Sequence, residues 1–179
     1  MLEICKELNL RMLSGTKILG KKIVFPITIT KEMLTDDIFE KRKIHKADTI
    51  SDKPKIGLVN GLWANDMGVG GLVPIEAFSI PTENKLQLEL TGQQGDIMKE
   101  SMRCAKTVAW NIIPNKYKEI LNKEWNEFGN TGIHIHCPDG ATPKDGPSAG
   151  AAITTAIISL LMNEPVDNKI AMTGEINLK

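Results

Sequence analysis

The sequence predicts an α+β fold for most of the chain. Short alternating or apolar runs bounded by glycine and proline indicate strands in the first half of the main region, and longer stretches with helical spacing follow at about 95–113, 115–128 and 148–162. Strands and helices do not alternate regularly as βαβ units do. This irregular order favours mixed strands over a doubly wound parallel sheet.

Composition places the chain among globular proteins. Of its 179 residues, 41% are hydrophobic and 25% are charged, which supports a buried core and argues against a disordered chain. The 22 Lys and Arg residues balance the 22 Asp and Glu residues, so no global charge directs the protein towards nucleic acid or an anionic membrane. We therefore expect neither a nucleic-acid partner nor a membrane partner.

The N-terminal quarter of the chain reads as a separate small piece. Apolar positions in residues 2–13 have the spacing of an amphipathic helix, and Thr30 is a suitable N-terminal cap for a short helix over 31–40. A polar and basic stretch then ends at a proline, as surface linkers do. We expect two parts, residues 1–50 and a main domain over 55–179.

Five segments of the main domain read as strands: Lys55–Trp63, Leu72–Ile80, Lys85–Thr91, Ile133–Cys137 and Lys169–Thr173. In the third segment, leucines at 86, 88 and 90 alternate with polar residues, which predicts one buried face and one wet face. Pro114 and Gly129 are expected to end the first two helices.

Cysteine usage indicates a reducing compartment. Cys5, Cys104 and Cys137 are odd in number and widely spaced, without a C-x-x-C pair, so neither a disulfide framework nor a zinc site is expected. The charged N-terminus does not read as a secretory signal. The longest nearly apolar stretch, 149–162, is too short to span a bilayer.

The most informative segment is Pro143-Lys-Asp-Gly-Pro-Ser-Ala-Gly150. It places Ser148 between two glycines where a loop becomes a helix. Glycines let a substrate backbone approach closely, and free N–H groups at a helix start can stabilise an oxyanion. The alternative is that Ser148 is only the N-terminal cap of the helix. From spacing alone, the nucleophile and the cap are equally supported.

Gly146-Pro-Ser-Ala-Gly150 also matches the G-x-S-x-G elbow of α/β-hydrolases. That elbow needs a strand running directly into the serine, followed by an acid and a histidine. Here a loop rich in proline and glycine precedes Ser148, and no histidine follows it. We therefore interpret the match as false.

Two other patterns suggest ligands but favour plainer interpretations. His134 and His136 share one face of a predicted strand, whereas Cys137 points to the other face, so a metal site lacks a third ligand. Residues Gly15 to Lys22 resemble the pattern of a phosphate-binding loop. However, Lys22 stands where that loop has the Ser or Thr that binds Mg²⁺, and the predicted element before the segment is a helix instead of the required strand. We expect no metal and no nucleotide at these positions.

The last segment, Met172-Thr-Gly-Glu-Ile-Asn-Leu-Lys179, allows two interpretations. Thr173 and Glu175 could orient a catalytic amine. Alternatively, the segment is a tight turn between strands in which Gly174 supplies unusual backbone angles. The pattern alone favours the turn.

Taken in order, these segments resemble the proteolytic domain of Lon, the family of ATP-dependent Ser–Lys proteases. The resemblance rests on the Ser148 motif, on Ala171-Met-Thr-Gly-Glu175 and on upstream segments in the same order. These are Gly61-Leu-Trp-Ala64, Gly70-Gly-Leu-Val-Pro-Ile-Glu-Ala77, Leu90-Thr-Gly-Gln-Gln-Gly-Asp-Ile-Met-Lys-Glu-Ser101 and Ile133-His-Ile-His-Cys-Pro-Asp-Gly140. It covers about 55–179. Residues 1–50 are similar, more weakly, to the end of the ATPase lid and its connector.

The resemblance implies a Ser–Lys peptidase. Ser148 would be the nucleophile, activated by a neutral lysine, and Thr173 matches the residue that hydrogen-bonds that lysine. Asp145 and Glu175 match motif positions with supporting roles. The family also implies a homohexamer, unfolded polypeptide substrates, and ATP with Mg²⁺ bound by a separate ATPase module, with no cofactor in the proteolytic domain itself.

One departure from the family concerns the base. The family's lysine lies downstream of the Thr-Gly-Glu segment, beyond Lys179, and neither Lys144 nor Lys179 matches it. No Walker motif is present either. We therefore expect the chain alone to be inactive, as a lid remnant plus an incomplete proteolytic domain. The alternatives are an inactive assembly module with this fold and, less favoured, an acyl hydrolase that pairs Ser148 with His136.

Overall fold

The computed structural model describes residues 2–24, 26–38, 50–64, 70–138 and 145–178. Internal contacts divide the chain into two compact units, Met1–Lys46 and Ala47–Lys179. The junction between the units lies largely outside the described residues. The assignment of the first unit to an ATPase lid stays a prediction.

The first unit contains the two predicted helical segments. Helix α1 spans Leu2–Ser14, and α2, Lys31–Met33, continues into a π-helical turn over Leu34–Ile38. The hydroxyl of Thr30 accepts the N–H of Met33 at 3.3 Å, which confirms the predicted cap. An ion pair between Arg11 and Asp37 joins α1 to the π-helical turn.

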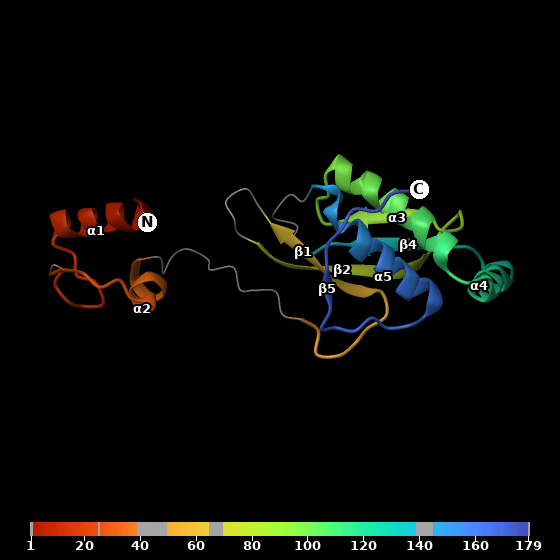
Figure 1. Ribbon diagram of the computed structural model, residues 1–179, viewed down its shortest axis with the longest axis horizontal. Coiled ribbons are helices and arrows are strands. Elements are labelled where there is room, and N and C mark those ends of the chain that lie inside the picture. Colours follow the sequence, from red (N-terminus) through yellow and green to blue (C-terminus); the bar gives the residue numbers. More distant parts are fainter. Residues whose placement is uncertain (1, 25, 39–49, 65–69, 139–144, 179) are drawn as a thin grey trace. The chain divides into compact units, whose positions relative to one another are not determined.

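The second unit is built on a mixed sheet of five strands. Figure 1 shows this sheet with helices α3 (Asp96–Ile112) and α5 (Gly150–Met162) beside it. Its strands are β1 (Leu58–Ala64), β2 (Gly70–Pro81), β3 (Leu88–Thr91), β4 (Thr131–His136) and β5 (Ala171–Met172), in the order β3-β4-β2-β1-β5. The pairs β1/β2 and β2/β4 are antiparallel, and β3/β4 and β1/β5 are parallel. Together with the helices, this mixed sheet confirms the α+β prediction.

Three predicted strands begin later than expected. β5 starts at Ala171 rather than Lys169, and the other two start late because of their backbones. Gly57 has φ +71° and Leu86 has φ +54°, both in the left-handed region that a strand excludes. β1 therefore starts at Leu58 rather than Lys55, and β3 starts at Leu88 rather than Lys85. Of the three leucines predicted to alternate within one strand, the first, Leu86, lies outside β3.

The helices of the second unit lie within a few residues of their predicted bounds. They are α3 (Asp96–Ile112), α4 (Asn115–Phe128) and α5 (Gly150–Met162). The segment expected to open the third helix is instead a 3₁₀ turn, Pro147–Ala149. This turn holds the central serine of the sequence motif.

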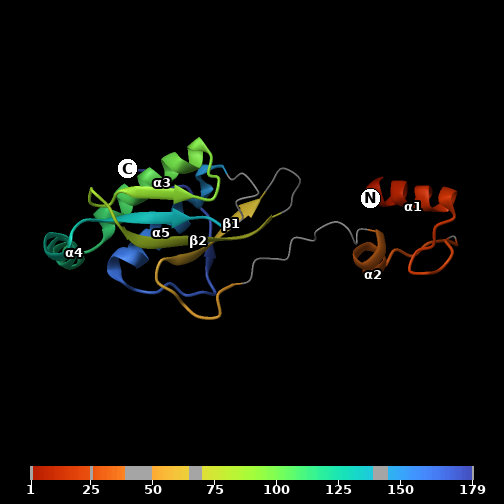
Figure 2. The same cartoon turned by 180° about the vertical axis from the view of Figure 1, so that it is seen from behind.

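Helices α3 and α5 cover one face of the sheet, as the opposite views in Figures 1 and 2 show. The two helices contact each other, and both carry fully buried alanines, whose small side chains allow close packing: Ala105, Ala109, Ala152 and Ala156. Ile75 and Ile135 from the sheet complete the core beneath them. This packing fixes the N-terminus of α5, where Ser148 lies.

Candidate functional site

Ser148 occupies the 3₁₀ turn that leads into α5, with its side chain exposed. Gly146 precedes it with φ +127°, a conformation that strains residues with a Cβ. The N-terminal cap position of α5 belongs to Ala149, and no side chain of the described residues caps that end. The interpretation of Ser148 as a helix cap is therefore wrong. Within the described part of the chain, its hydroxyl forms no hydrogen bond and is open to a ligand.

The Thr173–Glu175 segment lies directly against this turn. The N–H of Gly174 donates to the carbonyl of Ser148 at 2.7 Å, and the carbonyl of Gly174 accepts from the N–H of Ala151 at 2.8 Å. The hydroxyl of Thr173 also donates to the carbonyl of Ser148, at 3.2 Å. The two motifs, which the sequence separates by 25 residues, therefore lie against each other in the fold.

The predicted turn between strands is not found in this segment. Gly174 has no positive φ, and the chain after β5 continues as coil against α5. Thr173 and Glu175 are both exposed beside the 3₁₀ turn Pro147–Ala149, which we call the serine turn. Among the described residues, Glu175 makes no hydrogen bond. Their placement is compatible with the orienting role that the sequence left open.

Asp145 bonds to the start of α3 rather than to Ser148. Its Oδ1 accepts the N–H of Met98 and the N–H of Gly146, each at 3.0 Å. Met98 is the third residue of α3, where helix N–H groups lack partners within the helix. Asp145 thus caps a helix from a distant segment of the chain, and in doing so it holds the serine turn.

The histidines of β4 form a separate group. His134 Nε2 and His136 Nδ1 lie 2.9 and 2.7 Å from the same hydroxyl, Thr91 Oγ1. A hydroxyl has one proton, so at least one ring nitrogen must donate to it. Neither ring bonds to Ser148 within the described residues, and the Ser–His pair that an acyl hydrolase requires is not formed.

The described residues hold no cluster of three or more His, Cys, Asp or Glu side chains able to bind a metal ion. Cys137 is buried on the opposite face of the strand from the two histidines, as its alternation predicts. Lys144 and Lys179 lie outside the described residues. No helix in the described part of the chain is long and apolar enough to cross a membrane.

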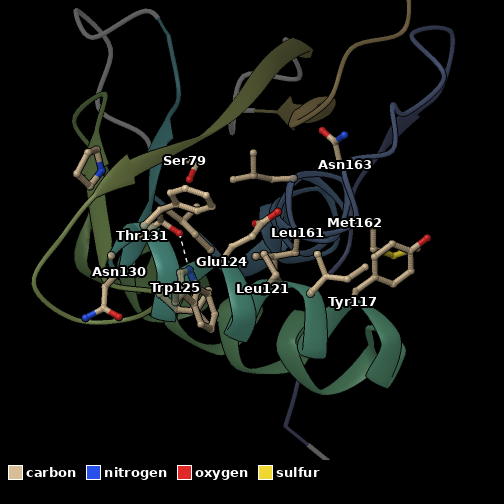
Figure 3. Close-up of a pocket in the computed structure, with 18 residues that line it drawn as sticks. Ser79, Tyr117, Leu121, Glu124, Trp125, Asn130, Thr131, Leu161, Met162 and Asn163 are labelled. Carbon is tan, nitrogen blue, oxygen red and sulfur yellow. Dashed lines mark hydrogen bonds between the residues drawn. The ribbon is translucent and has the colours of Figure 1, made fainter.

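A cavity of about 720 Å³ lies at the other end of α5. Figure 3 shows Glu124 and Trp125 of α4, Thr131 of β4 and Leu161 of α5 around it. No residue of the Ser148 turn or of the Thr173–Glu175 segment lines it. Since α5 has 13 residues, it separates the cavity from Ser148 by about 20 Å.

Sequence reasoning missed the contribution of α3 to the site. Three residues at or near the start of α3 contribute: Gly95 and Met98 contact Asp145, and Ser101 bonds to Pro147 of the serine turn. A glycine directly before a helix was the only signal in the sequence, and it reads equally well as an ordinary helix start. The contact between distant segments had no local signature.

Comparison with known proteins identifies relatives over nearly the whole chain. The profile of the Lon protease (S16) C-terminal proteolytic domain matches residues 28–179. The chain is 41% identical over 172 residues to a Lon protease homolog of Acanthamoeba polyphaga mimivirus and 44% identical over 160 residues to the Lon protease of Fervidobacterium nodosum. It is 42% identical over 178 residues to the Lon protease of Haemophilus influenzae.

These alignments cover 90%, 89% and 99% of this chain but only 16%, 18% and 20% of the respective relatives. The chain thus spans about a fifth of the length of the curated relatives that it matches. The matched profile begins at residue 28, within the part predicted as a lid remnant.

Proposed function

Because this chain belongs to the family of the Lon protease C-terminal proteolytic domain, we propose that it is the peptide-hydrolysing part of a longer, ATP-dependent serine endopeptidase. Membership of this family makes it a peptidase domain by descent. We propose in addition which residue is the nucleophile, what acts as the base, what the substrate is and how the longer protein assembles.

The observation that carries the proposal is the setting of Ser148. Its exposed hydroxyl has no hydrogen-bond partner among the described residues, while its own carbonyl is fixed by the N–H of Gly174 and the hydroxyl of Thr173. The backbone is held and the side chain is left available. A nucleophile needs this combination, since attack requires a defined position and an unshielded oxygen.

We propose that Ser148 Oγ attacks the carbonyl carbon of an unfolded polypeptide and forms an ester while the amine of the cleaved bond leaves with a proton. Water then attacks the ester and releases the acid product, which restores the hydroxyl. A neutral lysine would accept the proton of Ser148 in the first step, as the family implies. Thr173, which lies 3.2 Å from the carbonyl of Ser148, would help to hold that amine.

The proposed setting is an intracellular, reducing compartment, which the free thiols of Cys5 and Cys104 support. The longer protein would assemble as a homohexamer that feeds unfolded chains to Ser148. ATP and Mg²⁺ would act in its ATPase module, and the proteolytic domain itself would need no cofactor.

The test is Ser148-dependent cleavage of a reduced, carboxymethylated polypeptide with and without added methylamine. No amine bonds to Ser148 among the described residues, so we expect negligible cleavage in plain buffer. Cleavage should rise with the concentration of unprotonated methylamine, which supplies a base. Ser148→Ala should abolish it, whereas Ser79→Ala, at an exposed serine of β2, should not. Cleavage that survives Ser148→Ala would refute the nucleophile. No cleavage at any amine concentration would favour an assembly module.

A further inference from the structure

The start of α3 has an unusual cap that involves the serine turn. Its N-terminal cap residue is Gly95, whose carbonyl accepts the N–H of Lys99 at 3.0 Å but which has no side chain to offer the helix. The residue types preferred at this position supply an oxygen to the second or third N–H of the helix. Here that oxygen comes from Asp145, 47 residues away from the Met98 N–H that it accepts.

The missing side chain at Gly95 is what makes room for Asp145. A Cβ built on Gly95 would lie 2.3 Å from the carboxyl carbon of Asp145 and 2.6 Å from each of its oxygens. Gly95 itself has φ −70° and ψ 174°, which any residue can adopt, so backbone strain does not require glycine here. The requirement is for space, and the space is filled by the carboxylate.

A second contact from α3 reaches the same turn. Ser101 is buried, and its hydroxyl donates to the carbonyl of Pro147 at 3.4 Å. The same hydroxyl would lie 3.0 Å from a Cβ on Gly150. Met98 and Ser101 of α3 therefore hold the turn at two points before Ser148, Met98 through Asp145 and Ser101 through Pro147.

We propose that Gly95 and Ser101 are positioning residues for Ser148: the bare helix start at Gly95 takes Asp145 as its cap and thereby fixes the serine turn on α3. This inference rests on the proposed function, because it deepens the role of Ser148. It assigns Asp145 a purpose beyond helix stability. The carboxylate connects α3 to the turn, and a cap supplied by α3 itself could not do so.

The test separates capping from positioning by moving the cap. In Asp145→Ala, the amide N–H of Met98 loses its acceptor, and the melting temperature should fall by a few degrees. The N–H of Gly174 donates to the carbonyl of Ser148, so its hydrogen exchange measures how firmly the serine turn is held. This exchange should become at least about tenfold faster. In the double variant Gly95→Ser with Asp145→Ala, the new hydroxyl caps α3 locally, and no carboxylate remains to clash with it.

We expect the double variant to recover the melting temperature and the protection of Met98, while Gly174 continues to exchange fast. If the double variant restored the exchange protection of the Gly174 amide as well as that of the Met98 amide, the proposal would be overturned, because Asp145 would then be only a helix cap. Unchanged Gly174 exchange in Asp145→Ala would overturn it as well. Gly95→Ala, which excludes Asp145 by its Cβ, should reproduce the Asp145→Ala pattern at both amides, and a normal Gly174 amide there would contradict the proposal.

Two controls complete the set. Asp96→Asn removes an equal charge at the same helix start, on a fully exposed side chain, and should leave Gly174 exchange unchanged. Asp145→Asn keeps an acceptor oxygen and should retain most of the protection at both amides. None of these readouts needs Ser148 to react, so a failure of the proposed peptidase chemistry would appear separately, as absent Ser148-dependent cleavage with an intact exchange pattern.

Discussion

Gly174 bonds to the backbone of Ser148 at a distance of 2.7 Å, N–H to carbonyl, and its own carbonyl receives the N–H of Ala151. These two hydrogen bonds, one donated and one accepted by the same glycine, connect the segment after β5 to the serine turn and to the first turn of α5. The serine turn is held by this segment on one side and by the start of α3 on the other. Three segments distant in the chain therefore determine where one hydroxyl lies.

Close packing at Gly150 should make this residue intolerant of a side chain. A Cβ there would lie 3.0 Å from the backbone N of Ile176 and 3.0 Å from the hydroxyl of Ser101. Alanine favours helix by about 1 kcal/mol over glycine, but overpacking costs about 1–3 kcal/mol. We expect Gly150→Ala to lower stability by about 1 kcal/mol, measured by urea unfolding.

The matched control for Gly150→Ala is Gly174→Ala. Among the described residues, a Cβ on Gly174 would meet only the Cβ of Ala151, at an ordinary 3.4 Å. This variant should unfold within about 0.5 kcal/mol of the parent chain, as substitutions away from tight contacts do. Equal destabilisation by both variants would contradict the packing described around α5.

Ser159 of α5 stabilises the fold through a hydrogen bond to a residue that is distant in sequence, Gly57 just before β1. Its buried hydroxyl accepts the N–H of Gly57 at 3.0 Å and donates to the carbonyl of Glu164. Ser159→Ala would leave the buried N–H of Gly57 unpaired, which costs about 1–3 kcal/mol. Thr155→Val removes a hydroxyl of the same helix that bonds mainly to Ala151 within the helix, and it should cost less than about 1 kcal/mol. Thermal unfolding of both variants compares them, and the reverse order would contradict the assignment.

Acid should release a turn in the first unit. The N–H of Leu19, and after it the Arg11 guanidinium, lower the pKa of Asp37 from its ordinary 3.8. Because the folded pKa is lowered, Asp37 stabilises the unit above the unfolded pKa, and this stabilisation is lost as pH falls through the folded value. The amide signal of Leu19, recorded by NMR, should therefore titrate below pH 3.8.

Two variants check that titration. Asp37→Asn should abolish it, whereas Glu32→Gln, at an exposed carboxylate of the same unit, should leave it in place. A Leu19 amide that titrates at pH 3.8 or above would show that the Asp37 contacts do not favour its charged form.

Sequence patterns predicted elements well and contacts between distant segments poorly. The helices α3 and α4 were predicted within two residues, because apolar spacing and the breakers Pro114 and Gly129 are local signals. The starts of β1 and β3 were not, since the left-handed backbones of Gly57 and Leu86 have no reliable signature.

The candidate site shows the same division. The serine motif was visible as a pattern, and its junction with Thr173 followed only from a family resemblance. The cap from Asp145 to Met98 was not predicted, because an acceptor 47 residues away looks like any loop aspartate in sequence. Three-dimensional placement alone distinguishes it from a residue that faces solvent.

The most direct test of Ser148 as the nucleophile is its reaction with a phosphonofluoridate at pH 9, where solvent bases can take up the serine proton. Peptide mapping by mass spectrometry would locate the adduct, with the exposed Ser79 as an internal reference. We predict modification of Ser148 well ahead of Ser79, and no such adduct in Ser148→Ala. Modification of Ser79 at an equal or greater rate would contradict the claim that this fold prepares Ser148 for attack.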